Sequence, residues 1–287
     1  MTSPAHLEKL LVCTDESPDS QGAVTVALDL GKAAGCKVFL LQVLSFIPMY
    51  ELQTPDLVPP ATINLEMQAA QEAAVKSRLE AWRGKAAELG VDLEPRLRTS
   101  VSAYEGVLEE AEALQPDWII MGRHGLTGLA RLLMGSVTAR VIGHSPFNVL
   151  VVPQGAALEF KRLLVACDDS PFGAAAWQEA LSITQRMGSH LTGIAVAATD
   201  GEVKTATEVL RKMVAEANMR GVPLETAVPQ GQPDQAIIMF AQAKKVNLII
   251  LGSHGRTGLR KLLMGSVAER VIGQAPCAVL VVKKRVD

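Results

Sequence analysis

The stretches GRHGLTGLARLLMGS at residues 122–136 and GSHGRTGLRKLLMGS at residues 252–266 are so similar that this chain must contain an internal repeat. They belong to a longer match in which residues 116–152 align with residues 246–282 at an offset of 130, with 23 identities in 37 positions. Similarity of this density indicates a tandem duplication. A chain of 287 residues has the length for two domains.

A second matched pair lies upstream, KLLVCTDESP at residues 9–18 and RLLVACDDSP at residues 162–171, at an offset of 153. The larger offset means that the first copy carries 23 extra residues between the two matched regions. These extra residues fall around residues 46–64, which contain four prolines. Because prolines at this density exclude a regular element, we predict a long loop there.

Short apolar runs alternate with helical patterns in both copies. The runs lack in/out alternation, as is typical of parallel strands buried on both faces. We predict strands at residues 10–14, 38–44, 118–121 and 149–152, and in the second copy at 163–167, 191–197, 248–251 and 279–282. Helices are predicted in the first copy at 20–34, 66–89 and 103–114. The fold class is therefore α/β: two doubly wound, Rossmann-like domains with parallel five-stranded sheets in the order 3-2-1-4-5, at residues 1–153 and 161–287, joined by a linker at 154–160.

The spacing G-x2-G-x9-G-S occurs twice, each time after a strand and before a helix. Glycines permit a positive φ and a close approach to a ligand, and they leave N–H groups free for phosphate oxygens. The last helix then opens at Gly135-Ser136 or Gly265-Ser266, where a helix N-terminus favours an anion by about 0.3–1 kcal/mol. The serine either caps that helix or contacts a phosphate. Asp15 and Asp168 end the first strand of each copy and suit ribose hydroxyls.

With these motifs, together with VCTDES and VACDDS after the first strands, the chain resembles the universal stress protein family in its tandem form over nearly all of its length. The resemblance implies an adenine-nucleotide-hydrolase-like fold and ATP binding, with the aspartate on ribose, the end of the second strand on adenine, and the glycines and serine on the phosphates. It assigns Asp15, Val43, Met121, Gly122, Gly125, Gly135, Ser136 and Val137 in the first copy. In the second it assigns Asp168, Val196, Leu251, Gly252, Gly255, Gly265, Ser266 and Val267.

The glycine loops contain no Walker lysine, and Glu16 and Asp169 are the only further carboxylates near the predicted site. We therefore predict a protein of stress response or signalling that binds ATP (or ADP or AMP), with or without Mg²⁺, and turns it over slowly. Two alternatives stay open: a slow ATPase or phosphotransferase, and a dimerising scaffold that binds another small ligand. No residue is assigned to catalysis or to a metal, and His124 and His254 are interpreted as positioning the loop or contacting phosphate.

Other side chains receive simpler interpretations. The cations near the loops either neutralise phosphate or lie in solvent: Arg123, Arg131, Arg256, Arg260 and Lys261. The apolar residues of the matched stretches are assigned to the core, namely Leu132, Leu133, Met134, Met264 and residues 149–152. The copies differ at Val101-Ser-Ala103 and Gly231-Gln-Pro233, so the loop after the third strand is expected to differ in shape.

Composition argues against some classes of binding partner and bears on the compartment in which the protein acts. A net charge of −2, a pI near 6.2 and only 4% aromatic residues argue against nucleic acid as a partner. The four cysteines form no CxxC pair, and no apolar stretch approaches the ~18 residues that a membrane span needs, so we predict buried thiols and a cytoplasmic protein. The final strands at 149–152 and 279–282 are expected to pair within one chain as a pseudo-dimer, because an unpaired edge strand exposes N–H and C=O groups that can pair with another strand. A homodimer of the whole chain stays open.

Overall fold

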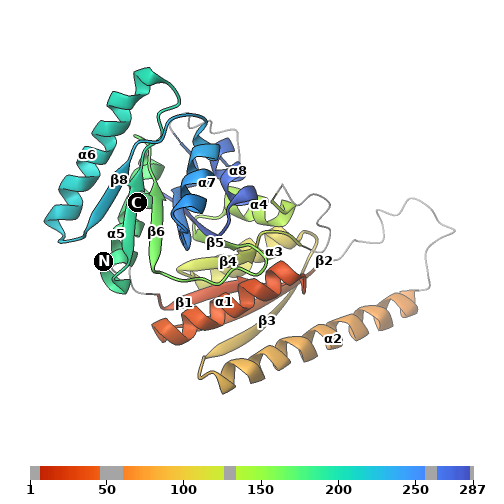
Figure 1. Cartoon of the computed structure of the whole chain (residues 1–287). Coiled ribbons are helices and arrows are strands. Elements are labelled where there is room, and N and C mark those ends of the chain that lie inside the picture. Colours follow the sequence, from red (N-terminus) through yellow and green to blue (C-terminus); the bar gives the residue numbers. More distant parts are fainter. Residues whose placement is uncertain (1–6, 46–60, 126–133, 256–263, 285–287) are drawn as a thin grey trace, which may run out of the picture.

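The chain folds as two α/β halves that repeat one order of elements (Figure 1). The structure is a computed structural model that describes residues 7–45, 61–125, 134–255 and 264–284. The first half contains β1 (Lys9–Cys13), α1 (Pro18–Ala34), β2 (Lys37–Ser45), α2 (Ala61–Glu88), β3 (Leu93–Ser100), α3 (Ala103–Leu114), β4 (Trp118–Gly122), α4 (Ser136–His144) and β5 (Asn148–Val152). The second contains β6 (Arg162–Ala166), α5 (Pro171–Met187), β7 (His190–Ile194), a 3-10 turn (Asp200–Glu202), α6 (Val203–Met219), β8 (Leu224–Ala227), α7 (Pro233–Ala243), β9 (Leu248–Gly252), α8 (Ser266–Gln274) and β10 (Ala278–Val282).

The described strands form one ten-stranded sheet in the order β3-β2-β1-β4-β5-β10-β9-β6-β7-β8. Each half has the predicted order 3-2-1-4-5 with parallel neighbours. The halves join through the antiparallel pair β5–β10, in which Leu150 lies opposite Leu280. This confirms the predicted pairing of the final strands. Because the two halves run in opposite directions at this seam, the carboxyl ends of their strands lie at opposite edges of the sheet.

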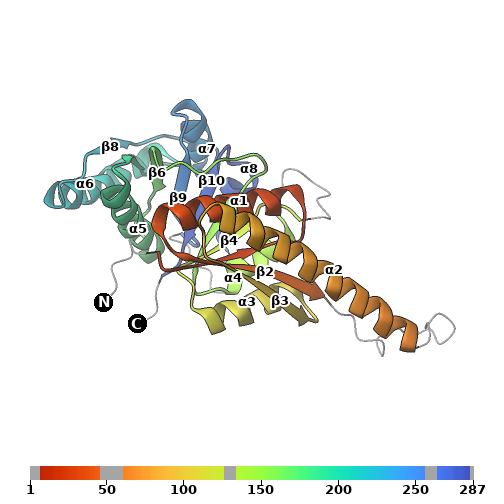
Figure 2. The same cartoon turned by 90° about the horizontal axis from the view of Figure 1, so that it is seen from below.

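Helices cover both faces of the sheet, which is why the strands are apolar throughout (Figures 1 and 2). One face packs against α1, α2, α5 and α6 through residues such as Leu10, Ile120 and Leu280. The other face packs against α3, α4, α7 and α8 through residues such as Leu11, Ile119 and Val279. Each core runs through both halves, so the seam at β5–β10 is part of a continuous interior.

Matching Ser-Pro pairs start the helices that follow the first strand of each half. Ser17 is the N-cap of α1 and accepts a hydrogen bond from the Ser20 N–H, and Ser170 caps α5 in the same way with the Gly173 N–H. Proline follows each cap at the first helical position, where its missing N–H costs nothing. The short loop between strand and helix is thereby fixed, and it carries the predicted aspartate.

The insertion in the first half is only partly a loop. Residues 61–64 belong to α2, so the prediction of a loop at 46–64 was wrong for its last four residues. Helix α2 has 28 residues against 17 in α6, and 11 of the extra residues therefore lengthen a helix. Residues 46–60, which hold the prolines, lie outside the described part of the chain. Beyond Pro60 the sequence is rich in alanine, glutamate and glutamine, which favour a helix.

Other predictions concern burial. All four cysteines are buried free thiols. Residues 149–152 and Met264 lie in the core, and Met134 packs against it, as predicted. Leu132 and Leu133 lie outside the described residues. Among the helices that the structure describes, none is both long and apolar enough to cross a membrane.

Candidate functional site

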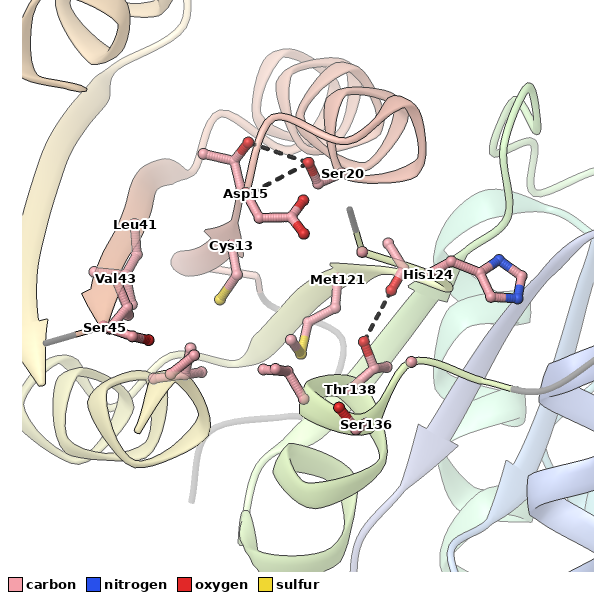
Figure 3. A pocket seen from close by; sticks show the side chains of 17 residues that line it. Cys13, Asp15, Ser20, Leu41, Val43, Ser45, Met121, His124, Ser136 and Thr138 are labelled. Atoms are coloured by element: carbon pink, nitrogen blue, oxygen red, sulfur yellow. Dashed lines mark hydrogen bonds between the residues drawn. The ribbon is translucent and has the colours of Figure 1, made fainter. Parts of the chain in front are cut away.

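A cavity of about 330 Å³, the first pocket, opens where β1, β2 and β4 end. It is lined by all eight residues predicted in the first copy: Asp15, Val43, Met121, Gly122, Gly125, Gly135, Ser136 and Val137. In Figure 3 the Asp15 side chain points toward the space between the ends of β1 and β4 and the start of α4, and Val43 and Met121 form apolar walls. The volume and the mixed lining are typical of small-molecule sites.

A cavity of about 480 Å³, the second pocket, lies at the equivalent place in the other half. It is lined by all eight residues predicted in the second copy: Asp168, Val196, Leu251, Gly252, Gly255, Gly265, Ser266 and Val267. The structure therefore brings together both predicted sets, and it places them at opposite edges of the ten-stranded sheet.

The two aspartates are held by their own helix caps. One oxygen of Asp15, Oδ1, accepts hydrogen bonds from the Ser17 N–H at 3.0 Å and the Ser17 hydroxyl at 2.6 Å. In the second pocket Asp168 Oδ1 accepts from the Ser170 N–H at 3.1 Å and from the Ser170 hydroxyl. The side chains are therefore fixed before any ligand arrives, which lowers the entropic cost of binding.

Other chain segments approach the first two glycines of each loop closely. A Cβ on Gly125 would lie 2.5 Å from Asp15 Oδ2, and one on Gly255 would lie 2.9 Å from Asp168 Oδ2. A Cβ on Gly122 would lie 2.7 Å from the Ser20 backbone nitrogen. The expected positive φ is wrong, since the six described loop glycines are absent from the left-handed region. The close approach that these glycines make is to the protein itself, and their approach to a ligand stays a prediction.

One end of each pocket is a helix N-terminus whose first N–H groups have no intrahelical acceptor. Helix α4 starts at Ser136 after the N-cap Gly135, and its first intrahelical bond runs from the Ala139 N–H to the Gly135 carbonyl at 2.9 Å. The N–H groups of residues 136–138 therefore have no intrahelical acceptor, and all three residues line the first pocket. Residues 266–268 repeat this arrangement in the second pocket. The serines do not cap these helices, contrary to one of the two predicted roles.

The backbone of Val43 faces the first pocket because of strand parity. The Thr14 N–H donates to the Leu41 carbonyl at 2.9 Å, so Leu41 faces β1. Alternate residues of a parallel strand face the same side, and Val43 therefore presents its N–H and carbonyl just beyond the end of β1. Such a pair of one donor and one acceptor matches the edge of a nucleobase.

The histidines of the two loops are held differently. Asp19, buried on α1, accepts from the His124 backbone N–H at 3.0 Å and lies 3.1 Å from its Nδ1. Phe172 takes the position of Asp19 in the second half, and its ring lies 5.1 Å from that of His254. Figure 3 shows the His124 imidazole directed away from the pocket. These contacts favour a role in positioning the loop, and the sequence analysis missed both partners.

Arg123 neither lines the first pocket nor lies free in solvent, so both of its predicted roles were wrong. Its guanidinium crosses to the second half and donates to the carbonyls of Ala275 at 3.0 Å and Ile272 at 3.5 Å. These carbonyls belong to the C-terminal end of α8, where a cation is favoured. The other predicted cations, Arg131, Arg256, Arg260 and Lys261, lie outside the described residues.

The carboxylates that follow Asp15 and Asp168 in the sequence are paired with basic side chains of other helices. Glu16 pairs with Arg78 of α2, and Asp169 lies 3.8 Å from Lys212 of α6. Glu16 does not line the first pocket and Asp169 does not line the second, although Asp169 lines a groove between α5 and α6. Within the described ranges, no group of three His, Cys, Asp or Glu side chains is arranged to hold a metal ion.

The two pockets differ in polarity although their loops match. Four hydroxyl side chains in the first pocket correspond to residues without a hydroxyl in the second: Thr14, Ser20, Ser45 and Thr138 become Cys167, Gly173, Ala198 and Ala268. The loop after the third strand differs as well, as expected. Gly231 has a φ of +114°, whereas Val101 at the equivalent position is not left-handed and is 65% exposed.

Comparison with known proteins accounts for the duplicated fold. The sequence model of the universal stress protein family matches residues 6–153 and 159–283. Universal stress protein E of Escherichia coli is 23% identical over an alignment of 309 positions, which covers 97% of this chain and 95% of that protein. Universal stress protein MJ0531 of Methanocaldococcus jannaschii is 33% identical over 141 residues, covering 44% of this chain and 83% of that protein. A universal stress protein structure from Archaeoglobus fulgidus shares the fold, with a TM-score of 0.74 at 23% identity over 96% of both chains. The chain belongs to the universal stress protein family and carries the family's domain twice.

Proposed function

We propose that each half of this protein binds ATP or another adenine nucleotide and that the chain acts in stress response or signalling in the cytoplasm. The observation that carries the proposal is that a fixed carboxylate and an unsatisfied helix N-terminus border one cavity, and that this occurs in both halves. An acceptor for sugar hydroxyls and a set of donors for phosphate, placed at the two sides of an apolar cleft, match the parts of a nucleotide.

Each part of the nucleotide has a proposed partner among the predicted residues. The base contacts the backbone of Val43 in the first pocket and of Val196 in the second, against the apolar side chains of Met121 and Leu251. Ribose hydroxyls donate to the aspartate. The phosphates accept from the first amides and the serine of α4 or α8, and they pass close to the glycines of the loop.

We further propose that turnover is slow. The described residues that line the pockets include no lysine or arginine to stabilise a transferring phosphoryl group. A rigid cradle that binds the ground state of ATP contributes affinity and leaves the reaction barrier unchanged. Slow turnover suits a protein whose occupancy reports on the nucleotide pool.

Calorimetric titration of the purified chain with ATP tests the proposal, after release of any co-purified nucleotide by heat and its identification by chromatography. Asp15→Ala and Asp168→Ala, made separately, are each expected to remove one binding event. Asp29→Ala, an exposed position on α1, is the matched control and leaves both events intact. A chain that binds no adenine nucleotide, or in which both aspartate variants bind like the control, contradicts the proposal. Single-turnover measurements that give hydrolysis faster than about one per second contradict slow turnover.

A further inference from the structure

The second pocket has a row of hydrogen-bond acceptors at its base end. The Ala197 N–H donates to the Pro229 carbonyl at 3.0 Å, on the side of β8. In a planar trans peptide the carbonyl of the preceding residue points the opposite way. The Val196 carbonyl therefore faces the side of β6, where the pocket lies.

The same reasoning places the carboxylate of Glu202 on the same side of the chain as that carbonyl. The Ala197 carbonyl accepts from the Gly231 N–H at 3.0 Å, so the Ala198 N–H points the opposite way, toward the pocket. Glu202 Oε2 accepts this N–H at 2.8 Å, and Glu202 lines the pocket. A carboxylate has about four lone-pair directions, so this single backbone bond leaves acceptor capacity for a ligand.

The first pocket lacks this feature among its described residues. Ser45 takes the place of Ala198, and β2 continues regularly to it, with Ser45 opposite Ser100 of β3. Asp15 is the only carboxylate among the described residues that line the first pocket. The described lining of the second pocket has two, Asp168 near the glycine loop and Glu202 at the base end.

We infer that Glu202 is a specificity-determining residue of the second pocket, whose carboxylate accepts a hydrogen bond from the exocyclic amino group of the nucleotide base. An amino group carries two N–H donors, which the Val196 carbonyl and the Glu202 carboxylate can accept together. The second pocket then prefers a base with an amino group over one without. A base that lacks the amino group still removes water from the Glu202 carboxylate but donates no hydrogen bond to it, which costs binding free energy. This inference rests on the proposed binding of nucleotides.

The test is a double-mutant cycle on the full chain, with Asp15→Ala present so that only the second pocket contributes. ATP is compared with purine riboside 5′-triphosphate, which lacks only the 6-amino group. Affinities are measured calorimetrically with Glu202 present and in the Glu202→Gln and Glu202→Ala variants. Glu208→Gln, on the exposed surface of α6 and paired with Arg211, is the control. Melting temperatures of all variants show whether each is folded.

With Glu202 present, loss of the amino group is expected to weaken binding about tenfold more than it does in Glu202→Ala. Glu202→Gln keeps an acceptor without charge and should give an intermediate ratio, and the control should match the parent. If Glu202 only closes the loop to Ala198, its removal changes both affinities equally and the inference is overturned. If neither nucleotide binds the second pocket, both the proposed function of that pocket and the inference are contradicted. This outcome is distinguishable from an equal change in both affinities, which overturns the inference alone.

Discussion

Alanine at Gly125 tests whether the close approach of the glycine loop to Asp15 builds the first pocket. The new Cβ would lie 2.5 Å from Asp15 Oδ2, and an ordinary contact begins at 3.4 Å, so the carboxylate or the loop must move by about 0.9 Å. Alanine at Gly255 would lie 2.9 Å from Asp168 Oδ2, which requires a smaller movement of about 0.5 Å.

The carboxylate of Asp15 has little freedom to move. Its other oxygen is held by the Ser17 N–H at 3.0 Å and the Ser17 hydroxyl at 2.6 Å. Relief of the clash therefore breaks these bonds or pushes the loop away from the pocket. Loss of one hydrogen bond between the carboxylate and a ribose hydroxyl is worth about 1.5–3 kcal/mol, or about ten- to a hundredfold in affinity. We expect Gly125→Ala to reach this range and Gly255→Ala to cost less.

Calorimetric titration with ATP, together with melting temperatures, is the assay. Gly84→Ala in α2 is the matched control, because a Cβ there meets nothing within 4 Å. In the interior of a helix that substitution should stabilise the chain by about 0.5–1 kcal/mol and leave affinity unchanged. A Gly125→Ala protein that binds ATP as tightly as the parent at the first pocket would refute the role of the close approach.

Three further predictions concern groups outside the nucleotide contacts. Arg123→Ala should lower the free energy of unfolding by about 1.5–3 kcal/mol in urea titrations, because carbonyls at the end of α8 lose a charged donor, whereas Arg83→Ala, an exposed pair on α2, should change it little. Burial lowers the pKa of Lys283 to about 8, below the 10.5 of an unfolded lysine, so the unfolded chain binds more protons between these values. Stability should therefore rise as pH increases from 8 to 10.5, and Lys283→Met should flatten that rise in urea titrations at several pH values. Burial raises the pKa of the Cys13 thiol to about 12, so iodoacetamide at pH 8 should label it, by mass spectrometry, only after unfolding; rapid labelling of the native chain would contradict its burial.

The fold and the predicted residue sets follow from local and repeated patterns. Apolar runs without alternation indicate buried parallel strands, and an Asp after β1 with Gly-Ser before α4 indicates the edge at which they meet. Duplication strengthens each of these signals, because an error in one copy would have to recur in the other. The pairing of β5 with β10 follows from the same repeat, since each half ends on an edge strand whose free side can pair with that of the other half.

The contacts that distinguish the two pockets could not be predicted in this way. Asp19 and Phe172 occupy one equivalent position and hold the two histidines by different interactions, a polar one and an aromatic one. A position within a helix does not reveal that its side chain meets a loop more than 80 residues away, since that contact depends on the packing of α1 and α5 on the sheet. Glu202 was missed because its role depends on the direction of the Ala198 N–H, which only the bridge beyond β7 determines.

The seam between the halves explains why the side chain of Arg123, in the first glycine loop, contacts the second half and does not line the first pocket. Because β5 and β10 run antiparallel, the C-terminal end of α8 lies at the same sheet edge as the first pocket, and the guanidinium of Arg123 reaches its last carbonyls. The reverse contact uses a different residue: the Lys283 ammonium, which follows β10, donates to the Ile142 carbonyl near the end of α4. Each helix that presents amides to a pocket at its N-terminus thus receives a cation from the other half at its C-terminus, where the helix dipole is negative. Ser253 replaces Arg123 in the second loop, so the two loops contribute unequally to the seam although their glycines are the same.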